Sequence, residues 1–81
     1  MNTYSFQMVC YCPVNDNQDV YDVEIKSLET IQVEDILDFV EEHNKTKIYQ
    51  ENLTKKFKDF FPQLNVKITG YHSNIKIESK L

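Results

Sequence analysis

The sequence predicts an α+β fold with the element order ββααββ. Two segments that alternate apolar and polar residues open the chain, the middle third changes to helical spacing, and two further alternating segments close it. This order predicts a four-stranded antiparallel sheet with two helices on one face, because a sheet and an amphipathic helix each bury one apolar side. We expect residues 1–81 to form a single domain.

The first two strands are predicted over residues 4–12 and 20–27. On one side of the first segment lie Tyr4, Phe6, Met8, Cys10 and Cys12. In the second segment, Tyr21, Val23 and Ile25 alternate with charged residues. The sequence Asn15-Asp16-Asn17 between them is typical of a turn, because short amide and acid side chains tolerate left-handed backbone.

Helical spacing begins at Val33. The residues predicted to face the core at i, i+3, i+4 and i+7 are Val33, Ile36, Leu37 and Val40. Residues 44–46 are expected to end this helix. The second helix is predicted from about Gln50 to Phe61, where Pro62 stops it. Its predicted inward residues are Leu53, Phe57, Phe60 and Phe61.

The last two strands are predicted over residues 66–69 and 75–78, which alternate again. We expect residues 70–74 to connect them. A domain this small buries a thin core, so association of several subunits would add buried area.

Composition and the N-terminal sequence indicate a cytoplasmic protein without a membrane partner. No apolar run approaches the roughly 20 residues that span a bilayer. The first residues lack the basic and apolar regions of a signal peptide. Cys10 and Cys12 occupy same-face positions of one strand, which suits an intrachain disulfide poorly, so both thiols are predicted to be free.

The charge is unevenly distributed along the chain. Residues 1–43 carry a net charge of −9 and residues 44–81 a net charge of +5, within a total of −4. A basic half is compatible with a nucleic-acid partner. The alternative is that these charges lie on solvated faces and pair across an assembly.

Cys12 and Asp19 bracket a short polar turn between the first two predicted strands. A thiol beside a turn is a candidate nucleophile, and a carboxylate seven positions later can fold back toward it and transfer protons. The alternatives are a small buried apolar cysteine and an ordinary turn aspartate. Cys10 is predicted to be a core residue.

The element Cys12-Pro13-x5-Asp19, within this order of strands and helices, resembles the nitrile branch of the tunnelling-fold family. That branch contains the 7-cyano-7-deazaguanine reductases and their archaeal reductase-like (QueF-like) relatives. The resemblance runs from about Met8 to Glu78. It implies that the sheets of several subunits join into a barrel, with binding sites between subunits of a homo-oligomer. It also implies that Cys12 adds to a nitrile and that Asp19 supplies protons.

Gln50 and Glu51 carry the second part of this resemblance. Glu51 falls where the family places its base-anchoring glutamate, at the start of the second helix, which implies that Glu51 and the adjacent Gln50 bind the base. Gln50 is a departure, because the nitrile branch commonly has His before the Glu. Gln-Glu-x-Leu-Thr is instead similar to the GTP cyclohydrolase branch, which needs zinc.

We expect no metal site. The candidate ligands Cys10, Cys12, His43 and His72 have no recognisable zinc-ligand spacing. Both histidines are predicted to be surface or loop residues, and His72 is a candidate for a subunit interface.

A second departure concerns the cofactor. The reductases carry a Glu-x-Lys-Ser element associated with NADPH, whereas residues 30–35 contain neither Lys nor Ser, so NADPH is not expected. The resemblance then implies an amidine-forming enzyme, in which ammonia attacks a Cys12 thioimide of 7-cyano-7-deazaguanine in tRNA and gives archaeosine. An NADPH-dependent reductase and a non-catalytic purine- or pterin-binding module are the alternatives. Whether the base is free, in tRNA or in DNA stays open.

Overall fold

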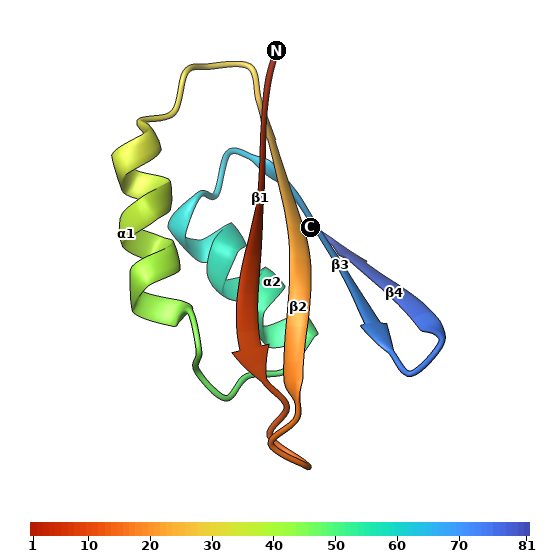
Figure 1. Cartoon of the computed structure of the whole chain (residues 1–81). Helices are drawn as coiled ribbons and strands as arrows, with labels where there is room; N and C mark the ends of the chain where they lie inside the picture. The colour runs from red at the N-terminus through yellow and green to blue at the C-terminus, as the bar shows by residue number, and fades with distance from the viewer.

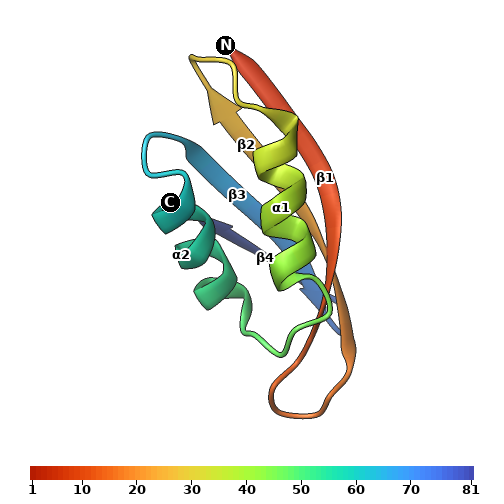
Figure 2. The ribbon, with the colours of Figure 1, turned by 90° about the vertical axis from the view of Figure 1, so that its left-hand side faces the viewer.

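The computed structural model describes all 81 residues and has the predicted element order. Its elements are β1 (Asn2–Tyr11), β2 (Gln18–Ser27), α1 (Val33–His43), α2 (Gln50–Phe60), β3 (Asn65–His72) and β4 (Ile75–Lys80). The strands form one antiparallel sheet in the order β1-β2-β3-β4. Both helices cover the same face of that sheet (Figures 1 and 2). The predicted α+β, ββααββ architecture is confirmed.

The core lies between the sheet and the helices. Fourteen buried residues form one cluster, which includes alternate residues of β1, β2 and β3. Two aromatic rings join the helices across this layer, because the centroids of Phe39 on α1 and Phe57 on α2 lie 4.0 Å apart. Burying each such side chain contributes about 1.5–3 kcal/mol relative to leaving it in water.

The rotation of α1 differs from the prediction. Ile36 and Phe39 are buried, whereas Val33 is 53% and Leu37 58% exposed. The inward stripe is therefore Ile36, Phe39, Val40 and His43, which has the same spacing but buries a large aromatic ring in place of Leu37. In α2, Leu53 and Phe57 are buried as predicted, and Phe61 is buried just beyond its end. Phe60 is 49% exposed, so its placement in the core was wrong.

The last hairpin is longer than predicted. Strand β3 continues through residues 70–72, and the connection to β4 is only the two residues Ser73 and Asn74. Ser73 has φ 57°, the left-handed geometry that a two-residue hairpin turn requires. Strand β4 is an exposed edge of the sheet, with Ile75 67% and Ile77 37% exposed.

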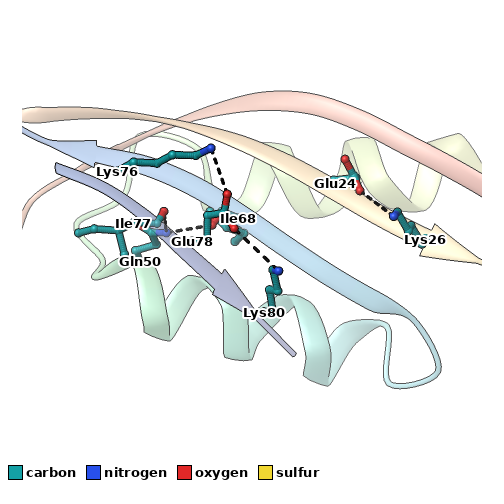
Figure 3. A network of polar contacts seen from close by, with 8 residues as sticks. All are labelled: Glu24, Lys26, Gln50, Ile68, Lys76, Ile77, Glu78 and Lys80. Carbon is teal, nitrogen blue, oxygen red and sulfur yellow. Dashed lines mark hydrogen bonds and ion pairs between the residues drawn. The ribbon is translucent and has the colours of Figure 1, made fainter. Parts of the chain in front are cut away.

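Charged side chains gather on β4, as Figure 3 shows. Glu78 lies 3.1 Å from the Lys76 amine and 3.8 Å from the Lys80 amine. Exposed pairs of this kind contribute little to stability. These charged side chains keep one face of β4 hydrated, whereas Ile75 and Ile77 lie on its other face.

The α1–α2 connection runs along the end of β1. The Tyr11 N–H donates to the Thr46 carbonyl (2.9 Å), and the Ile48 N–H donates to the Tyr11 carbonyl (3.1 Å). The Asn44 side chain accepts from the Val9 N–H at 2.8 Å. These bonds bring the start of α2 next to the turn that follows β1. Neither helix is long and apolar enough to cross a bilayer.

Candidate active site

One cavity contains all four residues that the sequence singles out. It has a volume of about 140 Å³ and is lined by Cys12, Asp19, Gln50 and Glu51 among twelve residues. Three parts of the fold form it: the β1–β2 hairpin, the start of α2, and the β3–β4 hairpin. Residues that are distant in sequence therefore meet, because the Tyr11–Ile48 bond brings α2 beside β1.

Cys12 lies in the first position after β1. Its N–H donates to the Asn17 carbonyl (2.8 Å), and its carbonyl accepts from the Asp16 N–H (2.9 Å). Asp16 takes a left-handed φ of 58°, as expected for the turn. The backbone of Cys12 is thus fixed on both sides, while its side chain forms part of the cavity wall and is 4% exposed.

Asp19 is half-buried on β2, directly opposite Cys10 in the strand register. Its Oδ2 accepts a hydrogen bond from the Tyr21 hydroxyl at 3.4 Å. Asp19 therefore lines the same cavity as Cys12 and has a hydroxyl, rather than a cation, as its partner.

Cys10 belongs to the core, as predicted. Its side chain is fully buried, and its Sγ lies 3.8 Å from the His43 carbonyl oxygen. Burial, and secondly the negative charge of Asp19, raise the pKa of Cys10 to about 11, against a smaller opposing effect of Thr46. Cys10 is therefore a protonated thiol at neutral pH, and it does not line the cavity. Both cysteines are free.

Gln50 and Glu51 form the first turn of α2. The Gln50 side-chain amide donates both hydrogens to backbone carbonyls, that of Ile68 at 3.0 Å and that of Ile77 at 2.9 Å (Figure 3). The side-chain oxygen of Gln50 accepts no hydrogen bond within the chain. Glu51 is exposed at the cavity wall. This end of the cavity therefore offers acceptors, which suit a ligand edge made of N–H donors.

Comparison with known proteins places this geometry in a known fold. No family model and no curated protein sequence matches the chain. A solved structure does: the apo form of the archaeosine synthase QueF-Like superposes with a TM-score of 0.85 over 99% of this chain and 89% of that one. The sequence identity is 13%. The chain has the tunnelling fold.

Within the tunnelling fold, the cavity includes residues that the sequence did not point to. Tyr21, Tyr49, Tyr71 and Ser79 also line it, together with His72, which was a candidate only for a subunit interface. Tyr21 could have been predicted to lie near the site, because it is two residues after Asp19 and thus on the same face of β2. His72 is exposed, as predicted for a surface residue, but it ends strand β3 and is not in a loop.

His43 is the last residue of α1, and its ring packs 4.2 Å from that of Phe39, measured between centroids. It is half-buried in a helix, so the prediction of a surface or loop residue was wrong for His43, and it lies outside the cavity lining. The structure contains no group of three His, Cys, Asp or Glu side chains that would hold a metal ion.

A larger hollow of about 670 Å³ lies at the opposite end of the molecule, between the β2–α1 connection and the residues after α2. Its lining includes Leu28, Asp35 and Phe60 but no thiol, imidazole or amine. The smaller cavity is therefore the better candidate for covalent chemistry.

Proposed function

We propose that this protein adds ammonia to the nitrile of 7-cyano-7-deazaguanine in tRNA and so forms the amidine of archaeosine. The observation that carries the proposal is that Cys12, Asp19 and Glu51 line one cavity. The fold shared with the archaeosine synthase QueF-Like supports a base of this class. The net charge of +5 over residues 44–81 supports a nucleic-acid partner.

The first step forms a covalent bond to Cys12. The thiol gives its proton to Asp19, the sulfur bonds to the nitrile carbon, and one π pair moves to the nitrile nitrogen. Asp19 then returns the proton to that nitrogen, which leaves a neutral thioimide and an unchanged carboxylate. Splitting the addition in this way replaces one difficult step by two easier ones.

The second step releases the product. Ammonia attacks the thioimide carbon, the C–S bond breaks, and one proton of the former ammonia returns to the Cys12 sulfur. The net change is addition of NH₃ across the nitrile, so neither an oxidant nor a reductant is consumed. NADPH has no role in these two reaction steps.

Glu51 selects the base in this scheme. A guanine-like edge presents N–H donors, and the free oxygens at the start of α2 accept them. A base that lacks these donors would leave the Glu51 carboxylate without partners, which costs far more than a missing apolar contact.

A second copy of the chain completes the site in our proposal. The β4 edge is unpaired, and Ile75 beside it is 67% exposed, as is expected of a surface that another subunit covers. Light scattering of the purified protein measures the number of subunits. A monomer that still turns over substrate contradicts this part of the proposal.

Intact-protein mass spectrometry after incubation with 7-cyano-7-deazaguanine tests the covalent step. The wild type gains the mass of one base, and Cys12→Ala gains none. Cys10→Ala is the matched control, because it removes the neighbouring thiol without touching the cavity. An adduct on Cys12→Ala, or none on the wild type, contradicts the mechanism.

Two further reactions separate the alternatives. With added ammonium the adduct decays to the amidine, whereas a reductase consumes NADPH and yields an amine. Base binding that is equal in the wild type and Cys12→Ala, without turnover in either reaction, indicates a non-catalytic binding module.

A further inference from the structure

Tyr21 is the structure's hydrogen-bond donor to Asp19. It lies on β2, is 5% exposed, lines the cavity, and its hydroxyl is 3.4 Å from Asp19 Oδ2. Burial, and secondly the charge of Asp19, raise the pKa of Tyr21 well above its ordinary value. The hydroxyl therefore keeps its proton and stays a donor at neutral pH.

The ring of Tyr21 packs against Gly70 of β3. A Cβ on Gly70 would lie 2.7 Å from Tyr21 Cε1 and 2.8 Å from Cδ1, so the ring packs against bare backbone of β3. Tyr21 also belongs to the main core cluster. The ring alone would fill this space equally well as phenylalanine, which leaves the hydroxyl to be explained by its one partner, Asp19.

We propose that Tyr21 is a positioning residue for Asp19, which it holds in the orientation that exchanges protons with Cys12. This inference rests on the proposed function. In the thioimide step the proton moves from Cys12 to Asp19 and then to the nitrile nitrogen, while Tyr21 keeps its own proton throughout. Its hydrogen bond to Oδ2 fixes the rotation of the carboxylate that takes the thiol proton.

Other titratable groups around Asp19 must be separated from this effect. Cys10 faces Asp19 across β1, while Cys12, Glu51 and His72 line the cavity from the hairpin turn, α2 and β3. Substitution of Tyr21 alone changes none of these groups. A loss of rate that vanishes when Asp19 is also replaced is therefore assigned to Asp19.

The test follows the rate of adduct formation by intact mass over a range of pH, in the wild type, Tyr21→Phe, Asp19→Asn and the double variant. Tyr21→Phe is expected to lower the rate about tenfold, near the lower end for a hydrogen bond to a charged group. In the Asp19→Asn background the same change has no further effect, because the two residues act as one unit.

Tyr11→Phe is the matched control, since Tyr11 lies on the adjacent strand and outside the cavity lining. Thermal unfolding of each variant checks that the fold persists. If the wild type forms the adduct and Tyr21→Phe has the wild-type profile, the role of Tyr21 is wrong and the proposed function stands. If Tyr21→Phe slows the reaction equally in the Asp19→Asn background, Tyr21 acts independently of Asp19 and the inference is also wrong. Absence of an adduct on the wild type overturns both proposals.

Discussion

The side-chain oxygen of Gln50 occupies the space that a side chain at position 70 would need. A Cβ on Gly70 would lie 2.7 Å from Gln50 Oε1. The amide nitrogen of the same side chain bonds to the carbonyls of Ile68 and Ile77, so Gln50 connects α2 to both strands of the last hairpin (Figure 3). Gly70 is thus required for its lack of a side chain, since its φ is not positive.

Gly70→Ala is expected to destabilise the protein by about 1–3 kcal/mol, the usual cost of overpacking a filled space. Urea denaturation measures the loss. Combining it with Gln50→Ala removes one of the two obstructing groups, so the double variant should cost less than the sum of the single variants. Strict additivity contradicts the predicted clash.

Asp19→Asn is expected to slow adduct formation about 100- to 10,000-fold, because the amide cannot accept the thiol proton. Asp16→Asn is the matched control, since Asp16 lies in the same hairpin and pairs only with the exposed Lys47 at 2.7 Å. Rates from intact mass that fall equally in both variants would point to a loop distortion and against proton transfer.

Glu51→Gln is expected to weaken binding of the base at least about tenfold, because a carboxylate that accepts from N–H donors is replaced by a neutral amide. Calorimetric titration with the base on Cys12→Ala measures affinity without covalent capture. Glu41→Gln, on the exposed side of α1, should bind like its parent. Unchanged affinity in the Glu51 variant removes that residue from the site.

Stability is expected to fall in alkali. The pKa of Cys10 is raised from its ordinary value of 9.0 to about 11 in the folded state, so its contribution to stability is complete below pH 9 and is lost as pH rises toward 11. Over that interval the unfolded chain releases the proton and the folded chain does not. Urea denaturation under reducing conditions at several pH values measures the slope. Cys10→Ala should show a smaller slope, and an identical slope contradicts the assignment.

The two phenylalanines that differ in burial provide a test of the core. Phe39→Ala is expected to cost about 3–5 kcal/mol, because Phe39 is 1% exposed and contacts the rings of both Phe57 and His43. Phe60→Ala, at 49% exposure, should cost clearly less. Equal losses in denaturation midpoint would contradict the difference in burial between the two rings.

Element order was predictable from this sequence because hydrophobic spacing is a local property. Alternation in residues 4–12 and 20–27 and the helical period after Val33 each follow from the nearest neighbours in sequence. The rotation of α1 about its axis was not predictable in this way, since Leu37 and Phe39 both fit an amphipathic pattern. Packing against Phe57, a residue of another helix, decides between them.

The sequence pointed to four residues that line one cavity, but not to the shape of that cavity or to its tyrosines. The spacing of Cys12 and Asp19 places both residues near one turn. Glu51 was predicted from the resemblance of the chain to the tunnelling-fold family. The bonds from Gln50 to two distant carbonyls depend on β3 continuing past Gly70 to His72. Glycine and histidine give that extension little local support, so the sequence suggested a loop there.

Cys12 and Asn17 close the first hairpin with a backbone bond, and everything between them is exposed. Asp16, within this exposed tip, also donates its N–H to the Cys12 carbonyl, so the tip is part of the turn that holds the Cys12 backbone. The side chain of Val14 is 76% exposed and can be exchanged without altering either bond, whereas a longer tip would displace the Asp16 N–H from the Cys12 carbonyl. Val14 is consequently a position at which a reporter group can be attached while the backbone of Cys12 stays held on both sides.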